Sequence, residues 1–370
     1  DHFFWIRTPY TPGYFKNFAE KVDEQDVVRV NAEGTLDARF MAQIGDDSLF
    51  IGSRKAAPVK ADETDQDALK TMQALTINDQ RIGCSIVSTA SANLVRAHET
   101  RVEIDATADD KDLNYIREDN RITDVLISSR QDAVENLQQI EKLINHLREI
   151  PHVNAVRLRS LKFNYEPALY TRELIDRLAE LNRLTVANPL RLEIETQFLH
   201  SSEIKPVHEE LVTALHNKGI TVYNNTPLLG NINDNAEEIH RLAFNCRQIG
   251  LEFHHLYVAG LPLQKEWNQK HPVDISTVID IATRVRKDGS GREIPRYIIL
   301  TELGEVDFGL TSKLSEENGK MALKLLPYGL DYFKAMDPAY DWPPQVRTDS
   351  DGKPILPIDG LVDTAGFLMT

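Results

Sequence analysis

The sequence is poor in cysteine. Among its 370 residues only Cys84 and Cys246 carry a thiol, too few for a disulfide framework or for a zinc site built from several thiolates. This composition is typical of a reducing compartment, so a cytoplasmic location is the default expectation. Apolar runs are short as well. None approaches the ~20 residues of a membrane helix, and we expect no membrane-spanning segment.

Positive charge is also in short supply. The chain has 42 lysine and arginine residues against 57 aspartate and glutamate residues, which gives a net charge of -15. The resulting field repels phosphate backbones, so we do not expect nucleic acid as a partner. The P-loop, G-x-G-x-x-G and G-x-S-x-G fingerprints are missing too.

What is present is a regular alternation that begins at Arg81. Apolar runs typical of strands alternate with amphipathic helical patterns, such as Leu137, Ile140 and Ile144 at steps of three and four residues. A repeat of roughly 30 residues predicts a parallel sheet with right-handed crossovers, either open or curled into a partial barrel. The expected strands are Ile82–Val87, Val125–Ile127, Val153–Leu158, Leu192–Phe198, Thr221–Tyr223 and Leu251–Val258.

Several segments of this region resemble the sequence blocks of one known enzyme family. Thr196–Ile204, T-Q-F-L-H-S-S-E-I, is similar to that family's T-Q/H-F-N-H-P-x-E-I. Gly219–Asp234, G-I-T-V-Y-N-N-T-P-L-L-G-N-I-N-D, resembles G-I-x-V-x-N-Q-T-V-L-L-x-G-V-N-D. Asp112–Ile127 and Leu147–Val153 resemble further blocks. The chain thus resembles the lysine 2,3-aminomutase family of the radical SAM superfamily over about residues 81–300.

The resemblance implies an α/β fold, a partial parallel (β/α)6 TIM-like barrel of radical SAM type with N- and C-terminal extensions. Its site would lie inside the carboxyl ends of the strands. We therefore expect three regions. Residues 1–80 form an N-terminal extension that packs on the barrel, residues 81–300 form the barrel, and residues 301–370 form a C-terminal hairpin and an extended tail.

The cysteines that this family uses are absent. The family's C-x3-C-x2-C falls on Ala90, Leu94 and Ala97, which have no thiolate to offer an iron–sulfur cluster. Two cysteines in the whole chain cannot replace them. We expect no cluster and do not expect radical SAM aminomutase activity by the usual route; whether the chain is an enzyme of another kind stays open.

Two other cofactor devices of the family are altered. Ser129–Asp132 stands where the family has G-G-D-P, which helps to hold S-adenosylmethionine. Arg286–Pro295 stands where the family has D-A-P-G-G-G-G-K-I-P, so Glu293 replaces the lysine that forms an aldimine with pyridoxal phosphate. Glutamate cannot form a Schiff base, and Lys287 would reach that role only after a shift of the loop. We expect no bound cofactor.

Polar residues at strand ends remain as candidates for binding a substrate. The resemblance assigns Asp234 to the distal amino group of an amino acid, although an Asn-Asp pair before a helix also favours an N-cap. His200 is expected in the hydrogen-bonding wall of the same cavity. Paired with Glu203, and with His254 or His255 as a third ligand, it could instead bind a metal, but we expect no metal. The remaining candidates are Arg130 and Arg159, for an anionic group or for ion pairing, and Asn225 and Glu293.

Three functions follow from these residues. The first is a degenerate aminomutase-like protein, a pseudoenzyme that binds a small amino-acid-like ligand or serves as a noncatalytic subunit with a protein partner or a second copy. The alternative is an enzyme of another class that uses the barrel pocket for polar or metal-assisted chemistry. An active amino-acid 2,3-aminomutase with unusual ligation is the least favoured of the three.

Overall fold

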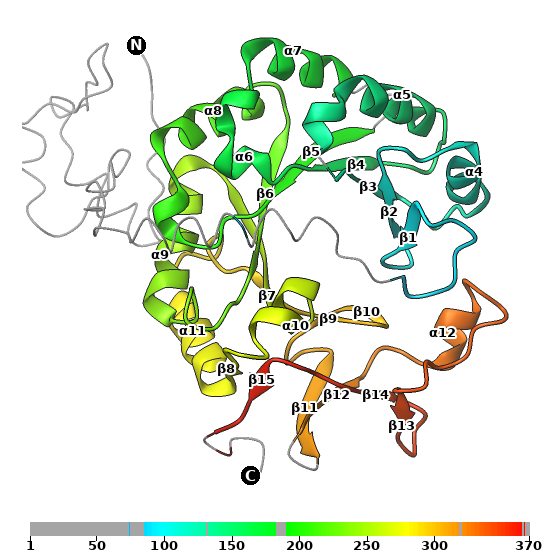
Figure 1. The fold of residues 1–370 in the computed structure, drawn as a ribbon, viewed down its shortest axis with the longest axis vertical. Helices are drawn as coiled ribbons and strands as arrows, with labels where there is room; N and C mark the ends of the chain where they lie inside the picture. Colours follow the sequence, from blue (N-terminus) through cyan, green and yellow to red (C-terminus); the bar gives the residue numbers. More distant parts are fainter. Residues whose placement is uncertain are drawn as a thin grey trace, which may run out of the picture. The chain divides into compact units, whose positions relative to one another are not determined.

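The computed structural model describes residue 74, residues 85–130, 132–182, 190–317 and 320–364, and residue 366. They belong to one unit, Glu63–Thr370. Its main sheet curls into a half-barrel with helices on the outside (Figure 1). The nine strands lie in the order β1 (Leu94–Arg96), β2 (Arg101–Asp105), β3 (Asp124–Ser128), β4 (Ala155–Arg159), β5 (Arg191–Thr196), β6 (Thr221–Pro227), β7 (Glu252–Ala259), β9 (Arg296–Thr301) and β10 (Gly304–Asp307).

The seven central strands, β2 to β7 and β9, are all parallel, and β1 and β10 add antiparallel edges. Six crossovers join the parallel strands, so the predicted partial (β/α)6 barrel is confirmed. The helices in these crossovers are α4 (Asp110–Glu118), α5 (Leu137–Arg148), α6 (Lys162–Tyr165), α7 (Arg172–Leu181), α8 (Pro206–His216), α9 (Ala236–Ile249), α10 (Pro262–Trp267) and α11 (Ile275–Asp288).

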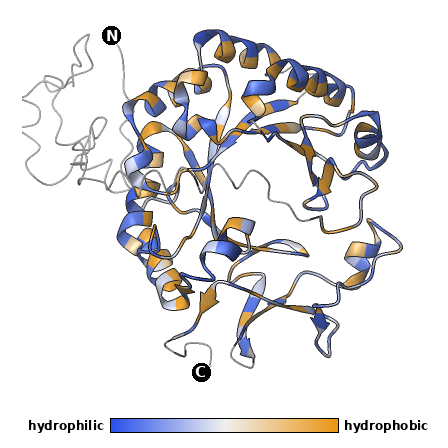
Figure 2. Ribbon diagram, viewed as in Figure 1, coloured by the Kyte–Doolittle hydropathy of each residue, from blue (hydrophilic) through white to orange (hydrophobic). Residues whose placement is uncertain are grey.

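Each crossover helix lays an apolar stripe on the outer face of the sheet. In α5 the stripe is Leu137, Ile140, Leu143, Ile144 and Leu147, all buried. Figure 2 shows the apolar side of the helices turned toward the strands and the polar side turned away. The strands supply aliphatic side chains at alternate positions, because successive residues of a strand point to opposite faces. The other alternate positions therefore point into the barrel.

The first expected strand is wrong. Residues 82–84 lie outside the described residues, and residues 85–87 form no strand. Ile86 and Val87 are buried as loop residues. Their apolar character therefore indicates burial and not a strand. The first parallel strand is β2 instead. The apolar segments Tyr297–Leu300 and Glu305–Leu310 predict a hairpin or closing strands, and β9 and β10 form an antiparallel pair there.

The ends of the main sheet meet through side chains. β1 and β10 share no ladder, but the turn before β10 touches the β1 side of the sheet. A Cβ at Gly304, which has φ +105°, would lie 3.3 Å from Ile86 Cγ2 and 3.5 Å from the Ala97 carbonyl oxygen. Arg101 of β2 also forms an ion pair with Glu305 of β10. We call this contact between the two edges the seam.

The chain continues beyond the barrel as a small antiparallel sheet. Its strands are β11 (Ser312–Glu317), β12 (Lys320–Leu325), β14 (Pro354–Pro357) and β13 (Arg347–Thr348), in that order. A short helix, α12 (Leu330–Lys334), interrupts the segment expected to be extended, and β15 (Leu361–Val362) pairs with β8 (Val273–Asp274). No helix of the described residues is long and apolar enough to cross a membrane.

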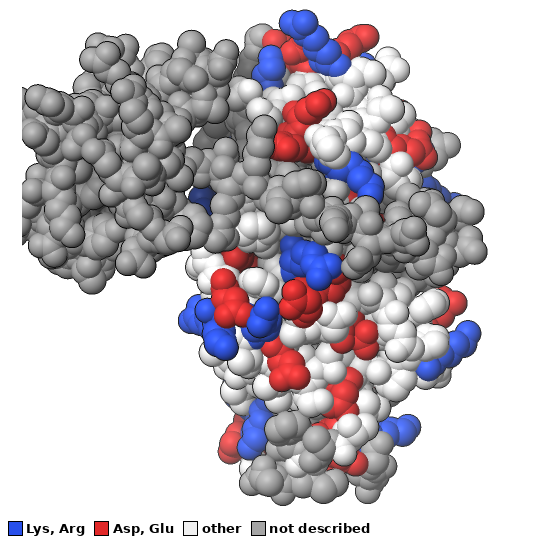
Figure 3. All heavy atoms as spheres, turned by 90° about the vertical axis from the view of Figure 1, so that its left-hand side faces the viewer, with Lys and Arg blue, Asp and Glu red and all other residues white. Residues whose placement is uncertain are grey.

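The outer surface mixes charges of both signs. On the face in Figure 3, acidic and basic side chains are interspersed. Arg284 of α11 illustrates the pattern, since it pairs with Asp288 at 2.9 Å and with Glu237 of α9 at 3.2 Å. Exposed pairs of this kind each contribute little to stability, roughly 0–1 kcal/mol. The charges that distinguish this fold lie inside the barrel.

Candidate functional site

Buried ion pairs line the interior of the barrel. Arg157 Nη2 lies 2.9 Å from Glu193 Oε2, and Arg157 Nη1 lies 3.5 Å from Glu195 Oε2. Arg159 contacts Glu195 and Glu103, each at 3.0 Å. The sheet register produces these contacts, because Arg157 stands opposite Glu193 and Arg159 opposite Glu195 on neighbouring strands. Charges this deeply buried persist in a fold only when they are paired.

The pairing keeps these groups ionised. Burial alone would raise the pKa of Glu195, but Arg159 and Arg157 hold it below its usual value. Burial likewise opposes the charge of Arg159, yet Glu103 and Glu195 raise the pKa of its guanidinium. At the seam, burial would raise the pKa of Glu305, and Arg101 holds it well below its usual range. The barrel interior is therefore a network of fixed charges of both signs.

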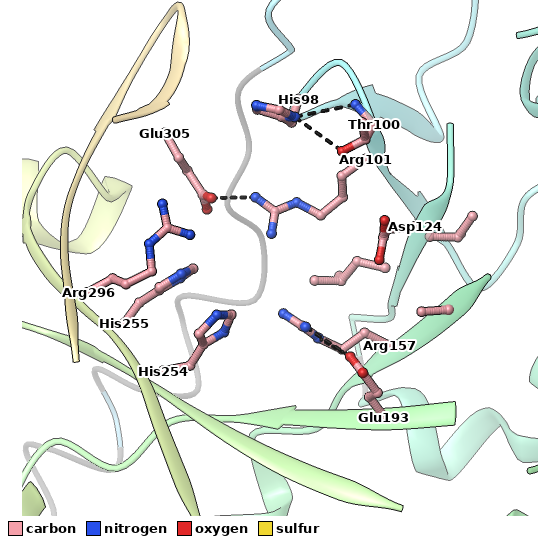
Figure 4. Close-up of a pocket in the computed structure, with 13 residues that line it drawn as sticks. His98, Thr100, Arg101, Asp124, Arg157, Glu193, His254, His255, Arg296 and Glu305 are labelled. Atoms are coloured by element: carbon pink, nitrogen blue, oxygen red, sulfur yellow. Dashed lines mark hydrogen bonds and ion pairs between the residues drawn. The ribbon is translucent and has the colours of Figure 1, made fainter. Parts of the chain in front are cut away.

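A cavity of about 280 Å³ opens inside the amino ends of the parallel strands (Figure 4). We call it the amino-end pocket. The first residues of four strands line it. Its wall also includes His98 and Thr100 of the β1–β2 turn, Val125, Leu126, Glu193 and Glu305. The charged and imidazole side chains that matter most for binding are Arg101, Asp124, Arg157, His254, His255 and Arg296.

Two consecutive histidines of β7 face this pocket. The ladder is irregular on both sides of them, with register shifts at Asn224/Asn225 and at Tyr257/Ala259. The His254 and His255 rings stack with their centroids 3.9 Å apart. Figure 4 shows both rings directed toward the cavity. Irregular pairing allows neighbouring residues to share a face that regular pleating would separate.

The histidine nitrogens lack partners within the described residues. His255 is 2% exposed, and neither of its ring nitrogens has a hydrogen-bond partner; the buried Nδ1 of His254 has none either. Burial lowers the pKa of His254 to about 4 and that of His255 to about 3. Arg157 lowers the pKa of His254 further. Both rings are therefore neutral near pH 7, and each carries one N–H donor.

An aromatic row continues on either side of the histidine pair. Tyr223 lies 5.1 Å from His254, and Tyr257 lies 5.7 Å from His255, measured between ring centroids. The Arg157 guanidinium sits 4.6 Å above the Tyr223 ring. The Tyr257 hydroxyl donates to Glu305 Oε1 at 2.7 Å. Stacking and these polar contacts hold the pocket wall in place.

Arg101 is the least saturated cation of this pocket. Its Nη2 donates to Glu305, and the described residues offer no acceptor for its other N–H groups. Arg157 instead uses Nε, Nη1 and Nη2 on two carboxylates, and Arg296 binds Asp307 through Nε and Nη2. In Figure 4 the Arg101 side chain reaches toward the middle of the cavity.

The predicted residue His200 lies elsewhere, after β5, and is engaged locally. Its Nδ1 lies 2.7 Å from Ser202 Oγ, and its Nε2 lies 3.1 Å from Glu238 Oε2. Burial raises the pKa of Glu203 to about 7, although its carboxylate accepts from the backbone N–H groups of Leu199 and His200. In the described part of the chain, no three His, Cys, Asp or Glu side chains are placed to hold a metal ion.

Asp234 closes a turn and is not the helix cap. Its Oδ1 accepts from the Asn231 N–H at 2.8 Å. The N-cap of α9 is Asn235, whose side chain accepts from the Glu238 N–H at 2.8 Å. The capping interpretation was thus one residue out. That Asp234 and His200 face one cavity stays a prediction.

The other candidates are scattered. Arg159 forms ion pairs with Glu103 and Glu195, which is the ion-pairing alternative; that it also binds an anionic group stays a prediction. Arg130 is exposed after β3. Asn225 is buried at the β6 irregularity, and its Oδ1 has no hydrogen bond among the described residues. Glu293 accepts from the N–H and hydroxyl of Ser290, each at 3.1 Å, in the loop before β9.

Two further sequence patterns come out differently. Cys246 falls on an apolar helical stripe, which predicts core packing, and it is fully buried on α9, where burial raises the pKa of its thiol. His208 precedes Glu209 and Glu210, which predicts a solvated helix face, and that prediction is wrong. It is 1% exposed, accepts from the Lys205 N–H at 2.9 Å through Nδ1, and contacts the Asn164 carbonyl at 2.8 Å through Nε2.

Sequence reasoning overlooked most of the charged interior, although a signal was there. In R-V-E of β2, R-L-R of β4 and E-I-E of β5, charged residues occupy every second position of a strand. Charged residues at alternate positions, with aliphatic ones between them, indicate a strand whose polar face is enclosed by a curled sheet. Arg101, Glu103, Glu193 and Glu195 could have been found in this way.

No family model matches the chain. Similar proteins are nevertheless known. They include an L-lysine 2,3-aminomutase of Fusobacterium nucleatum (28% identity over 190 residues, 51% of this chain and 42% of the relative) and one of Clostridium subterminale (30% over 190 residues, 51% and 43%). A glutamate 2,3-aminomutase of Clostridioides difficile is 27% identical over 188 residues, 50% of this chain and 42% of the relative. The chain thus spans less than half the length of these relatives. Matches to several such enzymes over about half the chain, together with the curled parallel sheet, show that this protein is similar to lysine and glutamate 2,3-aminomutases.

Proposed function

We propose that this chain is a degenerate member of the family, which works without the iron–sulfur cluster and binds a small amino-acid-like ligand. One observation carries the proposal. The three positions that correspond to the cluster cysteines hold alanine and leucine, and the whole chain has two cysteines. A [4Fe-4S] cluster is held by cysteine thiolates, so the residues present do not fit that group.

The surroundings of these positions support the proposal. Leu94 lies in β1, is 2% exposed and packs in the core. Ala97 lies in the β1–β2 turn, where its N–H donates to the Arg101 carbonyl at 3.0 Å. Ala90 is exposed in the loop before β1, and its carbonyl accepts from Lys111 Nζ at 2.9 Å. Each position has a packing or backbone role that needs no ligand.

The other two family cofactors do not fit the residues present either. Asp132, after β3, is buried and accepts from the N–H groups of Val134 and Lys162, at 3.1 and 2.9 Å. Burial raises the pKa of Asp132 to about 6. It joins the loops after β3 and β4 in place of a glycine-rich approach to a ligand. Glu293 offers a carboxylate bonded to Ser290, where pyridoxal phosphate would need an amine.

The ligand half of the proposal is supported by the charged barrel. An interior that keeps arginine, glutamate and neutral histidine side chains around a cavity is suited to a small molecule with groups of both charges. A barrel that served only as a scaffold would be expected to fill this space with apolar side chains, which replace buried ion pairs at little cost.

Anaerobic reconstitution tests the first half. The protein is incubated with iron, sulfide and reductant, desalted, and assayed for both elements, with the Clostridium subterminale relative treated in parallel as the positive control. We expect substoichiometric iron and no broad absorbance near ~400 nm. About four irons and four sulfides per chain would refute the proposal.

Calorimetry tests the second half. L-lysine and L-glutamate are titrated into the full chain without S-adenosylmethionine or pyridoxal phosphate. We expect saturable binding of at least one of them. If neither binds at millimolar concentration, the ligand half fails and a noncatalytic subunit becomes the better interpretation.

A further inference from the structure

We propose that the amino-end pocket is a binding site for a small α-amino acid, with Arg101 and the His254–His255 pair as donors to its carboxylate and Asp124 as the acceptor for its ammonium group. The inference rests on the proposed function for the kind of ligand. It adds the site, which lies at the amino ends of the strands, opposite the end where the family resemblance directs attention.

The balance of donors and acceptors at the pocket points to an acidic group. Glu193 and Glu305 line the pocket, but each already accepts from an arginine and a tyrosine. The donors are less occupied. Arg101 has N–H groups to spare among the described residues, and the histidine pair has unpartnered nitrogens. A ligand that supplies acceptor oxygens can pair with the spare N–H groups of Arg101 and with the one N–H of each neutral histidine ring, and a carboxylate does so with charge-assisted hydrogen bonds.

The His255 ring is buried with its hydrogen-bonding capacity unused among the described residues. Its two ring nitrogens are buried without hydrogen bonds, and the residue is 2% exposed. A buried polar atom that is left unpaired costs roughly 1–3 kcal/mol, and most such atoms in folded proteins have a partner. Its neighbour His254 has a buried, unpartnered Nδ1 as well. A ligand oxygen between the rings and Arg101 accepts from the ring N–H groups and removes the donor part of this cost.

Arg101 is suited to hold a carboxylate because its own position is fixed. Its partner Glu305 also receives the Tyr257 hydroxyl, so the carboxylate that anchors Arg101 cannot swing away. The remaining edge of the guanidinium presents a planar fork, which matches the two oxygens of a carboxylate. Lysine at this position would keep the charge and lose the fork.

Asp124 supplies the opposite charge. It is the first residue of β3, lines the same cavity, and its Oδ2 accepts from the Thr123 hydroxyl at 2.5 Å. Its Oδ1 has no partner among the described residues and remains available to an ammonium group. With about 280 Å³, the cavity lies just below the usual range of ligand pockets, ~300–1,000 Å³. It suits an amino acid and excludes a nucleotide cofactor.

The first experiment varies the ligand. L-lysine, L-glutamate and L-alanine are compared by calorimetry with L-lysinamide and cadaverine, which lack the carboxylate. We expect the carboxylate-free compounds to bind at least about tenfold more weakly than L-lysine, because they lose a charge-assisted contact. Equal affinity for L-lysine and cadaverine would overturn the proposal.

The second experiment varies the protein. Arg101→Lys keeps a cation beside Glu305, and His255→Phe keeps an aromatic ring in the row. Each is expected to weaken binding of the preferred amino acid at least about tenfold. The matched control is Arg121→Lys, because Arg121 also pairs with a carboxylate, that of Asp119 at 2.7 Å, and does not line the pocket. Its affinity should equal that of the parent.

The outcomes separate this inference from the proposed function. If amino acids bind the parent, and Arg101→Lys and His255→Phe bind equally well, this site is wrong and the proposed function stands. A loss on Asp234→Asn alone would place the ligand at the carboxyl ends instead. If no amino acid binds the parent, both fail together. Near-ultraviolet circular dichroism of each variant establishes that it is folded.

Discussion

The two ends of the barrel interior treat their polar side chains differently. At the carboxyl ends of the strands, His200, Glu203, Asn224 and Asn233 hydrogen-bond to nearby backbone or side-chain atoms and hold loops in place. At the amino ends, arginines and glutamates form pairs, while His254, His255 and one edge of Arg101 keep unused hydrogen-bonding capacity. A polar residue near a strand end therefore says little about function until its partners are known.

The difference has a physical origin. Carboxyl-end loops must turn from a strand into a helix, and Ser, Asn, Asp and Glu side chains satisfy the backbone groups exposed by that turn. Most amino-end side chains project from the strands themselves, whose backbone groups are already paired in the sheet. Their side chains therefore bond with one another, with water or with a ligand. Substitutions in the barrel interior and in the carboxyl-end loops test this contrast.

Arg159→Ala should be the most damaging change. It leaves Glu103 and Glu195 buried beside a missing cation, and breaking a buried pair of this kind costs about 3–5 kcal/mol. Urea unfolding followed by circular dichroism measures the loss. The control is Arg177→Ala, which removes an exposed pair with Glu141 and should cost less than about 1 kcal/mol. Equal losses would show that the interior pairs are no more important than surface pairs.

His208→Phe and His255→Phe should change the free energy of unfolding by different amounts, or in opposite directions, although both rings are buried. The first removes two hydrogen bonds and leaves the Asn164 carbonyl and the Lys205 N–H without a partner. This should lower the free energy of unfolding by about 2 kcal/mol. The second removes no hydrogen bond within the described residues, so its free energy of unfolding should stay within about 0.5 kcal/mol of the parent or rise. A large loss for His255→Phe would mean that its nitrogens have a structural partner.

Asn235→Ala and Asp234→Asn test the carboxyl-end loop before α9. Loss of the N-cap side chain at Asn235 should lower the free energy of unfolding by about 1 kcal/mol. Asp234→Asn keeps an oxygen that can accept from the Asn231 N–H, so the change should be below about 0.5 kcal/mol. Thermal and urea unfolding are both suitable. A larger loss of stability for Asp234→Asn than for Asn235→Ala would indicate that Asp234 is the N-cap.

The fold was predictable where apolar residues recur with a clear period. The stripe of α5 and the strands near residues 125, 155 and 192 are recognisable from spacing alone. Gly219 and Gly250 each stand between a helical pattern and a strand pattern, which predicts a helix end, and both have positive φ angles, +73° and +81°. β2 was not predicted because Arg101, Glu103 and Asp105 interrupt its apolar residues. A strand with a charged face is expected only where the sheet curls and encloses that face.

The pocket was harder to predict for a related reason. Its residues come from strands that are far apart in sequence, and each contributes one side chain at an unremarkable position. Sequence can show that Arg157 and Glu193 occupy strands, but their contact depends on register, which spacing does not reveal. The resemblance also directed attention to the carboxyl ends. There, local turn chemistry explains most of the polar residues.

The seam has a consequence for the order in which the molecule is built. Arg101 and Glu305 are 204 positions apart, whereas most strand contacts join neighbours in the chain. Contacts between distant residues pay the greatest loop-closure entropy and tend to form late. During synthesis the Arg101 guanidinium has no acceptor at position 305 until some two hundred further residues have been added. For that interval the nascent barrel has an open side, and a ligand can reach the pocket before the Arg101–Glu305 ion pair closes the seam.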